Sequence, residues 1–232
     1  MTEFSSLIKL SSFYDILDCL EYLFIKGCEG LVHLKVATIY GGGERLRRLN
    51  VYNCTTVKVI DLRSEPAKDW LPSLEVLSLQ FLPNLSHIRR NYASSKSHRN
   101  IRFFNIWYCS KLKNVSWILQ LPRLEKMYLF YCEGIEHIIG ENDVVEGSFE
   151  LVFRSLKTIS FRKLPKLRSF SNVASSFPIL KTFAMIDCPQ LRKLPSTDVL
   201  RQIIRLCTVV GTCGRTWNGI ILLQARVYSP SS

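Results

Sequence analysis

Apolar residues recur along this chain at a fixed set of intervals. In the stretch from Leu124 to Ile138 they stand 0, 3, 5, 8, 11 and 14 residues after the first. Neither the helical period of about 3.6 residues nor the strand period of about 2 produces this series over its whole length. Apolar residues fill the same six places in seven copies, which begin at Leu20, Leu46, Leu74, Ile101, Leu124, Leu156 and Leu180. We number the positions of each copy from this first residue, which is position 0.

The series is the leucine-rich-repeat pattern L-x-x-L-x-L-x-x-C-x-x-L. Positions 3 to 5 read as one short strand, and the remaining positions read as a turn and a loop that direct apolar residues into a shared interior. The pattern predicts an α/β-type solenoid: a leucine-rich-repeat horseshoe with a parallel concave β-sheet. Its convex side should be mostly irregular or 3₁₀, because helical periodicity is weak there and prolines such as Pro72, Pro122 and Pro178 lie outside the predicted strands.

Three regions follow from the extent of the repeats. Residues 1–19 are expected to form a partial repeat or an N-terminal cap, and residues 20–195 the repeat domain. Residues 196–232 lack the template and are expected to be an atypical cap or a disordered tail, with one candidate strand at Ile220 to Val227. The poor cover at the N-terminal end suggests that the chain is part of something longer.

The outward residues of the strands are the candidate binding site. Aromatic residues gather there on neighbouring copies and basic residues border them, which is the composition of interaction hot spots. The predicted protein-binding residues are Tyr52, Phe81, Phe103, Trp107, Tyr108, Lys126, Tyr128, Phe130, Tyr131, Arg162 and Lys163. The alternative is that some of these rings merely shield the sheet. Nucleic acid is disfavoured as a partner, because Glu75, Glu125 and Asp187 interrupt the basic residues and no nucleic-acid motif is present.

Candidate chemistry adds little to this picture. The net charge of +12 admits an acidic partner without selecting one. Five of the eight cysteines stand at position 8, which predicts small buried thiols and a reducing compartment. The glycines at 41–43 lack the G-K-[ST] of a phosphate loop, and no metal-ligand or nucleophile motif stands out. We therefore expect no enzyme, catalytic residue, metal or cofactor, no membrane span, and a cytoplasmic location.

Four phrases carry a family resemblance: LPSLEVLSLQFLPNLSHI, LPRLEKMYLFYCEGIEHII, FRSLKTISFRKLPKLRSF and FPILKTFAMIDCPQLRKLP. They are similar to the C-terminal repeats of plant coiled-coil, nucleotide-binding, leucine-rich-repeat (NBS-LRR) disease resistance proteins. Arg154 departs from that pattern where the family often has proline, and the tail after residue 200 does not match it.

The resemblance implies a non-catalytic recognition and regulatory module of an intracellular plant immune receptor. Such repeats sense a pathogen effector or a guarded host protein and restrain a nucleotide-binding switch domain, which this chain lacks. The expected partner is therefore a protein: an effector, a guarded host protein, or the receptor's own nucleotide-binding domain. The alternatives are a leucine-rich-repeat substrate adaptor for a ubiquitin ligase and a generic protein-binding scaffold.

Overall fold

The structure is a computed structural model of the 232-residue chain. It describes residues 20–36, 44–63, 71–89, 99–139, 150–170, 174–192 and 208–210. The side chains of residues 119–120, 150–152, 174–176 and 208–210 are not part of that description. The predicted cap at residues 1–19 and the candidate strand at Ile220 to Val227 lie outside the described residues.

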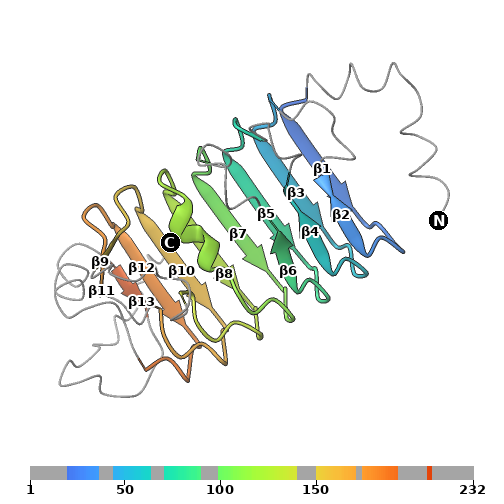
Figure 1. Ribbon diagram of the computed structural model, residues 1–232. Coiled ribbons are helices and arrows are strands. Elements are labelled where there is room, and N and C mark those ends of the chain that lie inside the picture. The colour runs from blue at the N-terminus through green and yellow to red at the C-terminus, as the bar shows by residue number, and fades with distance from the viewer. Residues whose placement is uncertain are drawn as a thin grey trace, which may run out of the picture.

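Within the described residues, eight parallel strands form one large sheet whose order follows the sequence. Figure 1 shows these strands side by side along the length of the molecule. They are β1 (Tyr22–Lys26), β3 (Arg48–Tyr52), β5 (Val76–Gln80), β7 (Phe103–Trp107), β8 (Lys126–Phe130), β10 (Thr158–Arg162), β12 (Thr182–Ile186) and β13 (Thr208–Val210). This arrangement confirms the predicted leucine-rich-repeat solenoid.

The seven predicted copies coincide with seven of these strands, each of which runs from position 2 to position 6 of its copy. Each strand residue pairs with the residue at the same position of the neighbouring copy, as Leu49 does with Leu77 and Leu77 with Phe104. The eighth strand, β13, continues the sheet beyond the last predicted copy by pairing Thr182 with Thr208. Equal register keeps each row of side chains in line across the sheet, so one position of the repeat makes one continuous stripe.

The core consists of the six inward positions. In the second, fourth, fifth and sixth copies all six are buried, and most of them are fully buried. The less buried members pack against this core and are Leu20, Leu23, Cys28, Leu31, Ile88 and Met185. Leu194, the last predicted core residue, lies outside the described residues. A repeat buries its apolar edge only against its neighbours, which explains why the middle of the solenoid is the best packed.

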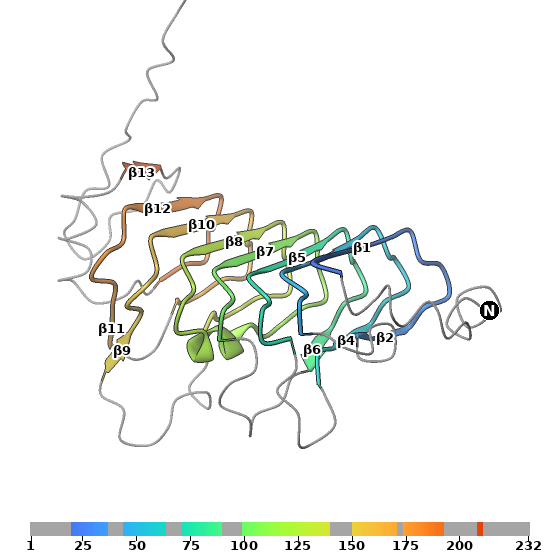
Figure 2. The same cartoon turned by 90° about the horizontal axis from the view of Figure 1, so that it is seen from above.

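The side of the coil opposite the large sheet contains short elements between irregular loops (Figure 2). A 3₁₀ helix, η1 (Ser116–Gln120), follows the fourth copy, as the prediction of a 3₁₀ and irregular side allows. Two small parallel ladders add to that prediction. Their strands are β2 (His33–Lys35), β4 (Val59–Asp61) and β6 (His87–Arg89), and β9 (Glu150–Val152) with β11 (Ala174–Ser176). The first ladder is centred on position 14, where Leu34, Ile60 and Ile88 point inward.

The cysteines at position 8 are structural, as predicted. Each thiol lies within hydrogen-bond range of the carbonyl oxygen two residues earlier, as in Cys132 to Phe130 at 3.3 Å and Cys54 to Tyr52 at 3.4 Å. Burial raises the pKa of the Cys132 thiol to about 12 and that of Cys28 to about 11, the latter with a contribution from neighbouring Cys54. These thiols therefore stay protonated near neutral pH and hold the turn that leaves each strand.

Candidate functional site

The outer surface of the large sheet is formed by positions 2, 4 and 6, which alternate with the buried positions 3 and 5. Register places Tyr52, Gln80, Trp107, Phe130 and Arg162 in one row at position 6. Position 7 follows directly and lies where the chain leaves each strand. Aromatic residues predicted from the sequence occupy both of these neighbouring rows.

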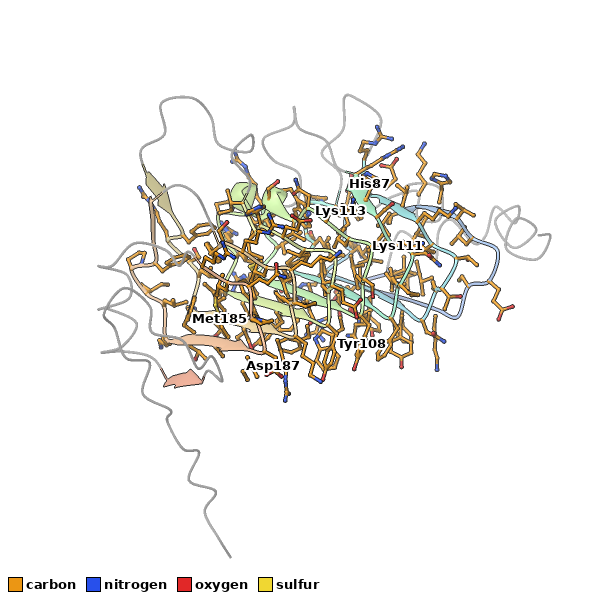
Figure 3. The ribbon with its side chains drawn as sticks, turned by 90° about the horizontal axis from the view of Figure 1, so that it is seen from below. His87, Tyr108, Lys111, Lys113, Met185 and Asp187 are labelled. Carbon is orange, nitrogen blue, oxygen red and sulfur yellow. The ribbon has the colours of Figure 1, made fainter. Side chains whose placement is uncertain are left out.

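The first aromatic group runs along the edge where the strands end, and we call it the aromatic edge. It consists of Tyr52, Phe81, Tyr108 and Tyr131, with ring centroids 5.2, 4.6 and 4.3 Å apart in that order. The last two pairs are stacked, and the Nζ atom of Lys163 lies 5.1 Å from the centroid of Tyr131. Figure 3 shows Tyr108 on the sheet side of the coil, with His87 and Lys113 on the opposite side.

An unusual backbone supports this edge. Position 7 has a positive φ of 51° to 64° in all seven copies, and glycine, the residue suited to such angles, fills it only in the first, at Gly27. The other six are Asn53, Phe81, Tyr108, Tyr131, Lys163 and Asp187. In the first six copies the amide N–H of this row donates to the position 6 carbonyl of the next copy, as Tyr108 does to Phe130 at 3.0 Å. The left-handed turn thus extends the backbone ladder while it directs aromatic rings along the edge.

The second aromatic group lies on the face of strands β7 and β8, and we call it the aromatic face. Its members are Phe103, Trp107, Tyr128 and Phe130. The ring centroids of Phe103 and Tyr128 are 5.3 Å apart, those of Trp107 and Phe130 are 5.2 Å apart, and those of Tyr128 and Phe130 are 5.9 Å apart. The structure therefore gathers all eight predicted aromatic residues into two groups.

The predicted basic residues are distributed around these rings. Lys163 faces Tyr131, and Arg162 stands next to Phe130 in register, close enough to favour the ionised form of Tyr108. Burial against its neighbours, followed by the effect of Tyr131, outweighs Arg162 and raises the pKa of the Tyr108 hydroxyl. Lys126 lies beside Phe103 in register. The rings thus form an apolar strip bordered by cations.

The sequence analysis missed two aromatic residues at the start of the solenoid. Tyr22 and Phe24 are each about half exposed, at 48% and 49%, and their ring centroids are 6.4 Å apart. Phe24 lies 6.4 Å from Tyr52 and so extends the aromatic edge by one copy. Both residues occupy outward positions, 2 and 4, so the template that selected Phe103 and Tyr128 also points to them.

The opposite edge of the sheet, where the strands begin, carries charges instead of rings. Position 1 reads Glu21, Arg47, Glu75, Arg102, Glu125, Lys157 and Lys181. Arg47 pairs with Glu75 at 2.9 Å and with Glu21 at 3.8 Å, and Glu125 pairs with Lys157 at 2.8 Å and with Arg102 at 3.5 Å. The hydrogen bond from Lys157, with the charges of Lys157, Arg102 and Lys126, lowers the pKa of Glu125. We call this row the charged edge.

Other chemistry is not assembled in the part of the chain that the structure describes. No group of three histidine, cysteine, aspartate or glutamate side chains there is placed to hold a metal ion. No helix among the same residues is long and apolar enough to cross a membrane. The candidate site is the surface formed by the aromatic edge and the aromatic face with their bordering cations.

Comparison with known proteins places this geometry in context. The leucine-rich repeats of plant disease resistance proteins like RPS2 match residues 7–133, which is more than half of the chain. Disease resistance protein SUMM2 of Arabidopsis thaliana is 34% identical over 96 residues, which cover 41% of this chain and 11% of SUMM2. Disease resistance protein RPS5 of the same plant is 35% identical over 88 residues, covering 38% of this chain and 10% of RPS5.

A longer match has a lower sequence identity. A probable disease resistance protein of Arabidopsis thaliana is 26% identical over 189 residues, covering 67% of this chain and 26% of that protein. In each of these comparisons the chain spans about a quarter or less of the length of its relative. The matches therefore concern the repeat region of those larger proteins.

Proposed function

Because this chain belongs to the leucine-rich-repeat family of RPS2-like plant disease resistance proteins, we propose that it is the recognition and regulatory module of an intracellular immune receptor. Leucine-rich repeats are a non-catalytic, protein-binding type of domain. In this proposal the repeats bind a pathogen effector or a guarded host protein. They also restrain the nucleotide-binding switch domain that the family resemblance implies.

The observation that supports a recognition role is the aromatic surface formed by the aromatic edge and the aromatic face. Its rings lie on the outer side of the sheet, whereas the inward positions already supply a complete core. Tyr108, at the centre of the edge, keeps 37% of its surface exposed. Large rigid rings near arginine and lysine, held by a stable sheet, are the usual anchors of protein interfaces. A purely structural role would not require such rings outside the core.

Photo-crosslinking tests the proposal. A photoreactive benzoylphenylalanine replaces Tyr128 in the full chain, which is then expressed in leaf tissue and irradiated. The matched control places the same group at Lys113, which is exposed on the opposite side of the coil (Figure 3). Proteins crosslinked at Tyr128 and not at Lys113 are identified, purified and mixed with the purified chain.

The proposal predicts saturable binding of at least one such protein to the purified chain. An identical set of crosslinks at both sites would contradict it. So would proteins captured at Tyr128 that show no binding once purified. Sequencing the coding region next to this chain gives an independent check, because a nucleotide-binding domain upstream supports the receptor and a ubiquitin-ligase adaptor domain supports the alternative.

A further inference from the structure

A second surface lies mainly over the first three copies and meets the aromatic face at Phe103. A groove of about 690 Å³ crosses the beginnings of strands β1, β3, β5 and β7. Its lining comes from positions 1, 2 and 4 of four successive copies. The lining residues are Glu21, Tyr22, Arg47, Arg48, Asn50, Glu75, Val76 and Phe103. Neighbouring strands are about 4.8 Å apart, so the groove runs about 14 Å along the solenoid, the length of about four extended residues.

One positive charge in the groove is not neutralised by its neighbours. The guanidinium of Arg47 lies between Glu21 and Glu75, at 3.8 and 2.9 Å, and engages both carboxylates of the groove. Arg48 is exposed, and its side chain has no ion pair or hydrogen bond with another described residue. A free guanidinium with five N–H donors is suited to a carboxylate.

The side-chain amide of Asn50 has one hydrogen-bonding atom without a partner in the described structure. Its Nδ2 atom donates to the hydroxyl oxygen of Tyr22 at 2.9 Å, while its Oδ1 atom is buried without a hydrogen-bond partner in the described structure. Turning the amide over would exchange the two atoms and leave the nitrogen without a partner instead. A ligand reaches this atom when the Asn50 side chain rotates outward, and a peptide bond, which offers both a donor and an acceptor, then satisfies the amide in either orientation.

The remaining walls are apolar, and the surroundings are basic. Tyr22 and Phe103 stand at the two ends of the part of the position 2 row that lines the groove, with Arg48 and Val76 between them. A second groove, of about 500 Å³, shares Glu21, Arg47 and Glu75 with the first and adds Arg45, Arg102 and Arg123. The two grooves together are lined by five arginines and two glutamates, which makes this end of the sheet attractive to an acidic ligand.

We propose that the groove binds an extended acidic segment of a protein partner. Arg48 holds an aspartate or glutamate carboxylate of the segment, and the Asn50 side chain rotates outward to hydrogen-bond its backbone. Apolar side chains next to the acidic residue pack on Tyr22, Val76 and Phe103. The two glutamates of the groove disfavour a polyanion such as nucleic acid, whereas one free guanidinium matches one carboxylate. This site goes beyond the proposed recognition by the aromatic surface, with which it shares Phe103.

Peptide display tests the proposal without a known partner. A library of random peptides is selected on the full purified chain and, in parallel, on Arg48→Gln and Arg154→Gln. Arg154 is an exposed arginine in the turn that precedes the sixth copy and controls for the general attraction of a basic protein. We expect the wild type and Arg154→Gln to enrich peptides with an acidic residue between apolar residues, and Arg48→Gln to lose that enrichment.

The best peptide is then synthesised with its acidic residue intact or replaced by the matching amide. We expect the amide peptide to bind the wild type at least tenfold more weakly, and Arg48→Gln to remove that difference. Combined replacement of Trp107, Tyr128 and Tyr131 by alanine should leave peptide affinity within about twofold, which separates this site from the aromatic surface. Enrichment of purely apolar or basic peptides, or equal losses in Arg48→Gln and Arg154→Gln, would overturn the proposal.

Discussion

At the charged edge, where the chain enters each strand of the large sheet, acidic and basic side chains alternate over the first five copies. At the aromatic edge, where the chain leaves the same strands, rings follow one another from Tyr52 to Tyr131. The backbone is equally regular at both. The position 1 amide of each copy from the second on donates to the position 1 carbonyl of the copy before, as Arg47 does to Glu21 at 2.8 Å.

The difference between the two edges lies in what remains available for a partner. Alternating charges largely satisfy one another within the row, as Arg47 does with Glu21 and Glu75. Stacked rings satisfy one another through their faces and leave edges and hydroxyl groups outside, so apolar surface persists. Register in a repeat protein therefore has two effects. In one row the side chains pair with one another, and in another row they form a surface that a partner can bury.

Both edges depend on the inward positions, and disrupting these should have the largest effect. Ile106→Asp combined with Leu129→Asp buries two unpaired charges between the fourth and fifth copies, where both residues are fully buried. We expect the free energy of unfolding to fall by more than about 5 kcal/mol. Hydrogen exchange should show loss of protection in these copies first, at both edges together. Lys111→Asp, at an exposed position, is the control and should leave protection unchanged.

Substitutions at the aromatic edge should have the next largest effect on the free energy of unfolding, and they test the left-handed backbone conformation there. Tyr108→Ala removes stacking on Phe81 and Tyr131 and should lower the free energy of unfolding by about 1–2 kcal/mol. Tyr108→Gly should be more stable than Tyr108→Ala by up to about 1 kcal/mol, because φ is 53° at this residue. Denaturant unfolding measures both.

Trp107, the preceding residue, is the control for the predicted order of stability, in which the glycine variant exceeds the alanine variant. It lies within strand β7 and lacks a positive φ, so glycine there should be less stable than alanine, which is the usual order. The same order at residues 107 and 108 would contradict the account of position 7.

The charged edge should give a smaller, salt-dependent effect. A double-mutant cycle of Arg47→Ala and Glu75→Ala should yield a coupling below about 1 kcal/mol, since Arg47 is exposed and Glu75 is partly exposed. The coupling should shrink further in 1 M salt. The corresponding cycle of Tyr108→Ala and Tyr131→Ala should keep its value in salt. A salt-sensitive aromatic pair would remove the distinction between the two edges.

The smallest effect concerns pH. The ordinary pKa of a glutamate is about 4.3, and that of Glu125 is lowered in the folded chain by Lys157 and Arg102. A lowered folded pKa contributes stability that is present above the unfolded pKa and lost as pH falls through the folded one. Glu125→Gln should therefore be less stable than the wild type at pH 7, and the difference should shrink as pH falls below the ordinary glutamate pKa and vanish once pH is below the lowered pKa of the folded chain. The difference caused by Tyr108→Ala should not change over that range.

The fold could be predicted from the sequence because one pattern of apolar positions recurs in seven copies. The buried apolar positions fixed where each strand begins and ends, and through register they predicted which outward rings would meet, such as Phe103 and Tyr128. The short ladder of β2, β4 and β6 was missed, because one inward residue per strand is too weak a signal. The positive φ of Phe81, Tyr108 and Tyr131 was also missed, since those residue types rarely adopt it.

The charges show a different limit. Alternation at position 1 is visible in the letters Glu21, Arg47, Glu75, Arg102 and Glu125, but the pairing depends on side chains from copies 23 to 32 residues apart meeting across the sheet. In the sequence Arg47 and Arg48 are two consecutive arginines that nothing distinguishes. The structure separates them, because Arg47 is held between two carboxylates and Arg48 is not. Only three-dimensional register distinguishes a satisfied charge from an available one.

The central claim is that inward residues maintain the fold while the outward aromatic residues carry protein recognition. Its most direct test is the affinity of the purified partner captured at Tyr128 for the wild type and for the combined variant Trp107→Ala, Tyr128→Ala and Tyr131→Ala. We predict a cooperative thermal transition in the variant and an affinity at least about 30-fold weaker. A folded variant that binds this partner with the affinity of the wild type would contradict the claim.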